Sequence, residues 1–337
     1  MHIIHESLNK IYYYWKRNNW LIDPRTYFGN YADIPIYKPI FLLGPHCGGL
    51  TLVSRMLRRH PSVVSCTGNY HYWAGADEMH TVLGPILPAE LTGIRYKAPY
   101  PNHPIFHPPK LRSWTYACDE LLPFYRKTAK DATPALKIKF QRIIRMIIGK
   151  YAINKYHARF TDKSQVYTVR VSLINELLKE YNPKFILVVM NPYALCYKAA
   201  IGIAADMAHL KNKLPLEKRL EICSEHWANS MNCALEDKEK DKNIDMLIIR
   251  FEDILFDPIT NMKKICEFVE LDFNKDMIPQ PHHKIPLGTD PRDEGKWYPL
   301  RPNMDKNYLE KLGRKEIEII SEKCKNLALR FGYEVPQ

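Results

Sequence analysis

Short apolar runs alternate with longer segments in which apolar residues recur at helical spacing along most of this chain. Continuous apolar runs of about four to eight residues are typical of strands that are buried on both faces of a parallel sheet. Such runs predict strands at 39–43, 63–66, 166–169, 185–189 and 246–251. The periodic segments predict helices at 49–59, about 110–155, 172–181, 258–269 and about 304–330. This alternation predicts a three-layer α/β sandwich with a central parallel sheet.

Two segments fall outside this alternation. Residues 1–35 combine aromatic and polar side chains, and they predict an extension that packs onto a single domain at 36–335. Between residues 83 and 110 seven prolines predict an irregular insertion, because proline lacks a backbone N–H. Long irregular insertions over an α/β core often face a substrate.

Residues 40–61 pair an apolar strand with a glycine-rich turn and an amphipathic helix. Gly44, Gly49 and Thr51 occupy the glycine and hydroxyl positions of a Walker A loop, but Leu50 stands in place of its lysine. Glycines let successive amides point at one anion, and the helix adds its positive end. The segment therefore predicts a phosphate-binding loop, and Leu50 disfavours a P-loop kinase.

This loop resembles that of the sulfotransferases that use 3′-phosphoadenosine 5′-phosphosulfate (PAPS), which reads roughly G-x-P-R-S-G-T-T-L-L-x-x-L-L before H-P. The matching residues are Gly44, Pro45, Gly49, Thr51, Leu52, Leu57, His60 and Pro61. Three later segments resemble the family in the same order: 162–178 (K-x-P…R…L…L), 185–194 (F-I-x-x-x-R-N-P-x-A/D) and 247–271 (R-Y-E-D-L…D-P…F-L-G-L). The resemblance covers most of residues 38–333. It implies a P-loop-like sulfotransferase fold and transfer of a sulfuryl group from PAPS to a hydroxyl or amine of a carbohydrate or other small acceptor.

The resemblance also implies where PAPS is held. The expected cofactor-binding residues are Gly44, Pro45, His46, Cys47, Gly48, Gly49, Leu50, Thr51, Asn191, Lys198, Phe251, Arg292 and Lys296. Asn191 either touches the ligand or shapes a turn, and Phe251 either stacks near the adenine or belongs to the core. His46 either donates to a phosphate when protonated or acts as a spacer.

Several residues depart from the family pattern. Cys47 replaces the basic residue of the loop, and Gly48 replaces its serine. Met190 takes the place of the strand-end arginine that holds the 3′-phosphate, and Lys198 that of a later serine. Because a buried phosphate needs cationic partners, we expect replacement charge from Lys198, Arg292 and Lys296. The alternative is a relative without activity that still binds a nucleotide or a glycan.

Sulfuryl transfer needs a base for the acceptor proton and positive groups near the leaving phosphate. The resemblance places the base after the first helix, where we expect His71, then Glu78, with His80 third. The alternative role of His71 is that of a hydrogen-bonded histidine beside aromatic neighbours. Lys163 matches a family lysine that faces the acceptor or the sulfate, and its alternative role is a surface ion pair. A thiolate nucleophile at Cys47 is disfavoured, because no paired histidine and carboxylate accompany it.

Composition limits the classes of ligand and partner that we expect. The chain has 337 residues, is 46% hydrophobic and carries a formal charge of +12, so anionic ligands are expected. Eight cysteines without a C-x-x-C pair and the lack of an apolar leader predict a cytoplasmic protein without structural disulfides. We expect neither a metal nor nucleic acid as a partner. The basic segment 137–159 predicts a solvated helix, with contact to a membrane surface or a glycan as the alternative.

Overall fold

The computed structural model describes residues 18–68, 77–92, 115–203, 205–280, 300–303 and 305–337, together with residues 8, 11 and 15. In this part of the chain five strands form one sheet in the order β2-β3-β1-β4-β5. All neighbouring strands are parallel, which confirms the predicted fold class. The strands are β1 (Ile40–Leu43), β2 (Val63–Val64), β3 (Arg159–Asp162), β4 (Lys184–Val189) and β5 (Asp245–Arg250).

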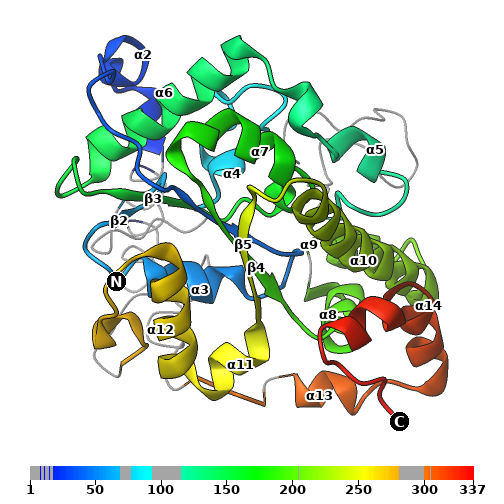
Figure 1. The fold of residues 1–337 in the computed structure, drawn as a ribbon. Helices are drawn as coiled ribbons and strands as arrows, with labels where there is room; N and C mark the ends of the chain where they lie inside the picture. The colour runs from blue at the N-terminus through cyan, green and yellow to red at the C-terminus, as the bar shows by residue number, and fades with distance from the viewer. Residues whose placement is uncertain are drawn as a thin grey trace.

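Helices cover both faces of this sheet (Figure 1). On one face lie α6 (Pro134–Tyr151), α7 (Val171–Leu178) and α10 (Leu216–Lys240). On the other lie α3 (Leu50–Leu57) and α12 (Pro258–Val269). The sheet is therefore the middle layer of a three-layer sandwich.

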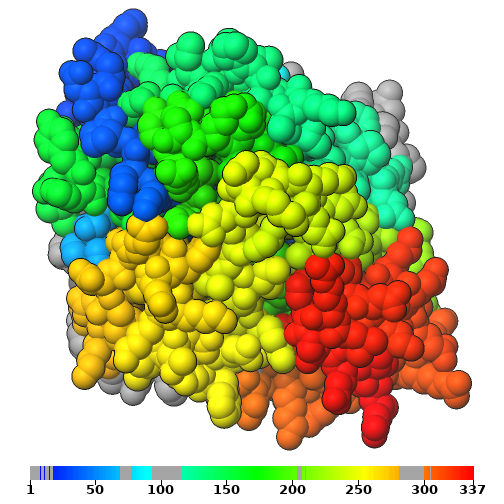
Figure 2. Space-filling model, viewed as in Figure 1, coloured from blue at the N-terminus to red at the C-terminus, as the bar shows by residue number. Residues whose placement is uncertain are grey.

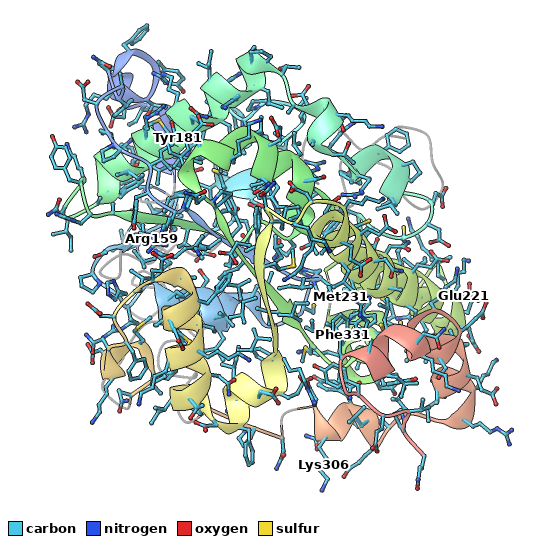
Figure 3. The ribbon with its side chains drawn as sticks, viewed as in Figure 1. Arg159, Tyr181, Glu221, Met231, Lys306 and Phe331 are labelled. Atoms are coloured by element: carbon cyan, nitrogen blue, oxygen red, sulfur yellow. The ribbon has the colours of Figure 1, made fainter. Side chains whose placement is uncertain are left out.

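Shorter helices connect these elements. They are η1 (Asn19–Leu21), α2 (Pro24–Phe28), α4 (Met79–Val82), α5 (Leu122–Tyr125), η2 (Ala129–Asp131), η3 (Gln165–Val169), η4 (Lys179–Tyr181), α8 (Pro192–Lys198), η5 (Ala199–Ile203), α9 (Ala205–Leu210), α11 (Phe251–Phe256), η6 (Lys275–Met277) and α13 (Lys306–Leu309). The last helix, α14 (Arg314–Arg330), packs along α10. Trp227 and Phe331 meet edge to face there at 6.2 Å, and Figure 3 labels Met231 and Phe331 at this contact.

The two central strands that border the phosphate loop, β1 and β4, are buried except for Lys184. In β4 the residues from Phe185 to Val189 have no exposed surface, as expected for a central parallel strand. Phe41 of β1 stacks on Phe185 at 5.7 Å and meets Phe160 of β3 edge to face at 6.0 Å. This aromatic contact fixes three neighbouring strands, so the loops at their carboxyl ends start from a rigid base.

Several predicted elements differ in the structure. The helix expected at about 110–155 is wrong in its extent, because its described part holds the short α5 and η2 before α6, and residues 152–158 are not helical. The helix expected at about 304–330 is divided into α13 and α14.

The strand expected at 166–169 is wrong, because these residues form the buried 3₁₀ helix η3 and the strand lies at β3 instead. Arg159 and Asp162 gave β3 a polar appearance, although both side chains are buried with hydrogen-bond partners. The long helix α10 had no counterpart in the predicted elements.

The N-terminal segment packs against the basic face of α6 (Figure 2). Arg142 donates to the Tyr27 carbonyl at 2.9 Å, and Lys150 pairs with Asp23 at 2.9 Å. These basic side chains therefore hold a segment of the same chain, which favours the structural interpretation of the helix. Across the described parts of the chain, we find no helix whose length and apolar character would let it span a membrane.

Candidate functional site

The predicted phosphate loop connects β1 to α3 at the carboxyl edge of the sheet. At its start the Gly44 amide donates to the Thr168 hydroxyl at 2.8 Å, and this hydroxyl donates back to the Gly44 carbonyl at 3.1 Å. A Cβ atom at Gly44 would lie 2.8 Å from the Val188 carbonyl oxygen. Thr168 of η3 thus fixes the loop entry, and close packing on β4 requires a glycine there.

The loop ends on a second glycine. Gly49 adopts a φ of 81° and precedes the first residue of α3. A Cβ atom at Gly49 would lie 2.2 Å from the Phe251 ring, which is itself buried at the start of α11. Phe251 therefore packs beneath the loop.

The loop leaves backbone donors available. The Gly48 amide closes a turn on the Pro45 carbonyl at 3.1 Å. Four other amides donate to no acceptor in the described part of the chain, and they belong to Cys47, Gly49, Leu50 and Thr51. Together with the positive end of α3, such amides are suited to an anion.

Cys47 lies at the tip of the loop with a φ of 65°, a left-handed conformation that is uncommon for a residue with a side chain. Burial raises the pKa of its thiol to about 11, and the nearby charge of Lys198 opposes this only in part. A thiol with such a pKa is a poor nucleophile near neutral pH. The structure thus argues against a thiolate mechanism.

Histidines near the loop are neutral. Burial lowers the pKa of His46 to about 4 and that of His80 to about 3. The His80 amide donates to Ser164 Oγ at 3.1 Å, whereas neither ring nitrogen of His80 has a hydrogen-bond partner within the described residues. Positive charge at the loop therefore does not come from these rings near pH 7.

A buried ionic cluster lies close to the loop. Lys163 is 2% exposed, pairs with Asp77 at 2.9 Å and also contacts Glu78. Asp77 also pairs with Arg58 at 2.8 Å and with Arg55 at 3.5 Å. The predicted surface location of Lys163 is therefore wrong, although the predicted ion pair is present.

The cluster sets the charge state of Glu78. Burial would raise the pKa of this carboxyl, but the Lys163 ammonium outweighs burial and holds the pKa below its ordinary value. In the same way, burial would lower the pKa of Lys163, but Asp77 and Glu78 outweigh it and raise that pKa. Glu78 is thus an ionised carboxylate whose oxygen is bound to an ammonium.

Asn191 and Glu252 meet where β4 and β5 end. The Asn191 amide donates to Glu252 Oε1 at 2.8 Å, and the Asn191 side chain caps α8 by accepting from the Tyr193 amide at 3.0 Å. Tyr333 donates to the other Glu252 oxygen at 2.6 Å. The turn-shaping role of Asn191 is therefore visible, and Met190 before it is fully buried.

Lys198 ends α8 beside the loop. Its charge lowers the pKa values of Cys47 and His46, so it acts on the loop electrostatically. Its ammonium lies 5.8 Å from the centre of the Tyr308 ring, and no carboxylate of the described chain forms an ion pair with it. Burial raises the pKa of nearby Asp305 to about 6, a value that the charge of Lys198 moderates. Among the described residues, Lys198 is therefore a cation at the loop that no carboxylate pairs with within ion-pair distance.

Comparisons with known proteins agree with this geometry. A family model described as "Sulfotransferase family" matches residues 39–275, which is most of the chain. The chain belongs to the sulfotransferase family. A search of curated proteins finds no match for this sulfotransferase.

Among solved structures, sulfotransferase STF9 from Mycobacterium avium is 15% identical, with a TM-score of 0.53 and coverage of 93% of this chain and 81% of that one. The sulfotransferase domain from the curacin biosynthetic pathway is 16% identical, with a TM-score of 0.49 and coverage of 89% and 99%. Mouse sulfotransferase SULT7A1 complexed with PAP is 17% identical, with a TM-score of 0.42 and coverage of 88% and 89%. At this identity the likeness to STF9 shows a shared fold.

Some expected site residues of this sulfotransferase lie outside the described residues, namely His71, Arg292 and Lys296. Sequence reasoning also missed residues that the structure brings to the site. No sequence pattern indicated a role for Thr168, because that role depends on a contact in space with the distant Gly44. Asp77 adjoins the expected Glu78, and the carboxylate pair could have indicated the ionic cluster.

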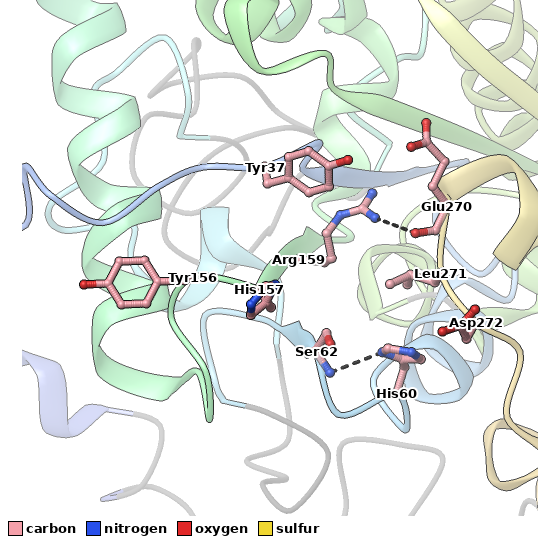
Figure 4. Close-up of a pocket in the computed structure, with 9 residues that line it drawn as sticks. All are labelled: Tyr37, His60, Ser62, Tyr156, His157, Arg159, Glu270, Leu271 and Asp272. Carbon is pink, nitrogen blue, oxygen red and sulfur yellow. Dashed lines mark hydrogen bonds between the residues drawn. The ribbon is translucent and has the colours of Figure 1, made fainter.

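A separate hollow of about 510 Å³ lies at the amino edge of the sheet, on the opposite side from the loop (Figure 4). Its lining is formed by Tyr37, His60, Ser62, Tyr156, His157, Arg159, Glu270, Leu271 and Asp272. Arg159 lies against the Tyr37 ring and donates to the carbonyls of Lys38 at 2.8 Å and Glu270 at 3.1 Å. The Arg159 cation is thus used to join segments of the fold.

Proposed function

We propose that this sulfotransferase transfers a sulfuryl group from PAPS to a hydroxyl or amine of a carbohydrate or other small acceptor. The observation that carries the proposal is the set of four open amides at Cys47, Gly49, Leu50 and Thr51, which adjoin the positive end of α3. Several donors without an acceptor in one short loop suit a phosphosulfate group, whose oxygens need many hydrogen bonds when they leave water. PAPS supplies the sulfuryl group when it is bound.

The proposed contacts divide between the loop and α8. The loop amides and the Thr51 hydroxyl hold the phosphosulfate end. Lys198 stands where the family has a serine near the 3′-phosphate, and its unneutralised ammonium makes it the described cation best suited to that phosphate. Arg292 and Lys296 remain proposed contributors, as do Pro45, His46, Gly48 and Asn191 around the loop.

The proposed base takes the acceptor proton. His71 is the first candidate. Glu78 is the second, and it can act only if its carboxylate exchanges Lys163 for the acceptor hydroxyl. Lys163 would then be left to stabilise charge on the transferred group, as the family resemblance implies. His80 is third, because burial lowers its pKa to about 3 and makes its neutral ring a weak base.

A second candidate function is binding without transfer. The observation that favours it is the contact between Glu78 and Lys163, which occupies two of the proposed reactive groups in one ion pair. A fully buried Met190 at the position of the family arginine points in the same direction. Such a relative would bind the nucleotide and leave an acceptor unchanged.

Calorimetry tests the proposal directly. The product nucleotide 3′-phosphoadenosine 5′-phosphate (PAP) is titrated into the full chain and compared with ATP and magnesium. We expect micromolar binding of PAP alone, weakened about tenfold in Thr51→Ala and in Lys198→Ala. The exposed Lys139→Ala is the matched control for charge and should bind PAP as the wild type does. Equal binding of PAP in all variants, or none in the wild type, would contradict the proposal.

Transfer is tested separately from binding. Radiolabelled PAPS is incubated with sugars and small alcohols, and label is sought in the acceptor. Label transfer that depends on Lys198 supports the enzyme. PAP binding without transfer to any acceptor, in wild type and in Glu78→Gln alike, would favour the non-catalytic relative.

A further inference from the structure

The hollow at the amino edge of the sheet is accessible from solvent (Figure 4). Two tyrosines that line it have large free surfaces, since Tyr37 is 50% exposed and Tyr156 is 73% exposed. Its volume of about 510 Å³ is within the range of pockets that hold small molecules. Tyr37 precedes β1 and Arg159 begins β3, whereas the phosphate loop follows the end of β1. A ligand can therefore enter this hollow without approaching the loop.

Several polar groups of this hollow have no partner. His60 Nδ1 accepts from the Ser62 amide at 3.2 Å, and Figure 4 shows this contact. Burial lowers the pKa of His60, so the ring is neutral near pH 7 and its proton lies on Nε2. The Nε2–H of His60, the Ser62 hydroxyl and the Asp272 carboxylate have no hydrogen-bond or ion-pair partner in the described part of the chain. The hollow thus presents a donor, an acceptor and a hydroxyl that can be either.

Arg159 joins the two walls of the hollow. Its guanidinium donates to the Lys38 carbonyl at 2.8 Å and to the Glu270 carbonyl at 3.1 Å. Both acceptor residues have a left-handed backbone, with a φ of 38° at Lys38 and of 57° at Glu270. Such conformations are uncommon for residues with a side chain, and they gather at ligand sites. Tyr37 and Leu271 are the neighbours of these residues in the chain, so the walls that they form are held in place.

The charges around the hollow favour a neutral ligand. Glu270 pairs with Lys38, whereas the unpaired carboxylate of Asp272 would repel an anion among the described residues. Arg159 and Lys38 would repel a cation. Both already lie 5.3 Å from the centre of the Tyr37 ring, so this ring is not available for a cation–π contact with a ligand. Hydrogen-bonding groups and aromatic surface remain, and these suit an uncharged ligand with several hydroxyl groups.

We propose that this hollow is a binding site for a neutral sugar unit of a glycan. One face of a sugar ring consists of C–H groups, and it packs on the exposed ring of Tyr156, which no aromatic or cationic group of the described chain covers. The sugar hydroxyls both donate and accept, so they match the Asp272 carboxylate, the Ser62 hydroxyl and the Nε2–H of His60. A sugar held here lies at the opposite edge of the sheet from the phosphate loop. The site thus recognises a glycan without taking part in transfer, and it does not depend on PAPS.

An NMR titration of the full ¹⁵N-labelled chain tests the site. The probes are the uncharged tetrasaccharides cellotetraose, maltotetraose, mannotetraose and N-acetylchitotetraose, each added to millimolar concentration. We expect at least one of them to bind and to shift the amide signals of Ser62, Leu271 and Asp272. Binding by none of the four, or shifts at Cys47 and Thr51 alone, would overturn the proposal.

Two exposed residues allow the contacts to be removed without loss of the fold. We expect Tyr156→Ala and Asp272→Ala each to weaken binding of that tetrasaccharide at least about fivefold, with an unchanged urea midpoint. Phe28→Ala and Asp33→Ala are the matched controls, because both residues are exposed and neither lines the hollow, and they should bind as the wild type does. Wild-type affinity in both Tyr156→Ala and Asp272→Ala would overturn the site. Tighter binding of the cationic, deacetylated chitotetraose than of N-acetylchitotetraose would overturn the assignment to a neutral sugar.

Discussion

The phosphate loop and the ionic cluster beside it differ in whether their polar groups have partners. In the cluster Lys163, Asp77 and Glu78 neutralise one another out of water. In the loop four amides have no acceptor within the described chain, and Lys198 has no carboxylate within ion-pair distance. Internal pairing is typical of a scaffold, whereas polar groups that await a partner are typical of a binding site. Substitutions in the cluster should therefore change stability, whereas removal of the Lys198 side chain beside the loop should change binding.

The largest expected effect is in the cluster. Lys163→Met leaves Glu78 and Asp77 without their shared ammonium and should lower the free energy of unfolding by about 3–5 kcal/mol. Urea denaturation measures it. Lys139→Met on the exposed side of α6 is the control and should change stability by less than about 0.5 kcal/mol. If Lys163→Met lowered the free energy of unfolding by less than about 1 kcal/mol, the cluster would not be an important source of stability.

Gly49→Ala should destabilise by about 2–4 kcal/mol, because the added methyl group meets the Phe251 ring and the φ of 81° disfavours a side chain. PAP binding should fall with stability, since the same turn aims the open amides. Gly313→Ala is the matched control, because its methyl group would meet only the end of the Glu316 side chain. A Gly49→Ala protein with wild-type stability and binding would show that the turn is not tightly defined.

Acid should weaken the fold through the buried histidines before it weakens the cluster. The pKa values of His80 and His226 are about 3 in the folded state, so below about pH 6.5 the unfolded chain takes up protons that the folded chain does not. This stability is complete above pH 6.5 and falls as pH falls. The expected loss is about 2 kcal/mol for each ring between pH 7 and pH 5.

Urea midpoints measured from pH 7 to pH 5 check this slope. His80→Phe should flatten it by the contribution of one ring, and the exposed His157→Phe should leave it unchanged. An equal slope in His80→Phe and the wild type would mean that the ring is not held neutral in the fold.

The smallest expected effect is the most specific. Lys198→Ala should weaken PAP binding about tenfold and change the free energy of unfolding by less than about 0.5 kcal/mol, because no internal ion pair is lost. Arg159→Ala at the amino edge should do the reverse, since it leaves the Lys38 and Glu270 carbonyls without a donor. Calorimetry measures PAP binding and urea denaturation measures stability, and both are carried out on both variants. Lys198→Ala with lost stability and normal binding would place Lys198 in the scaffold.

The sequence predicted those features that depend on neighbours along the chain. The spacing of Gly44, Gly49 and Thr51 defines the turn, and apolar runs define β1, β4 and β5. The prediction failed where distant contacts decide. Strand β3 reads as polar because Arg159 and Asp162 have partners in distant segments, at Glu270 and Met79. The contact between the His46 amide and His226 likewise joins residues 180 positions apart.

The single hydroxyl of Thr168 holds both polar groups of the Gly44 peptide backbone, and this has a consequence for hydrogen exchange. The Gly44 amide can exchange with solvent only when η3 and the loop separate, whereas the amides at the loop tip are open in the free protein. Hydrogen exchange should thus be slow at Gly44 and fast at the amides of the loop tip. A bound ligand should slow exchange only at the loop tip.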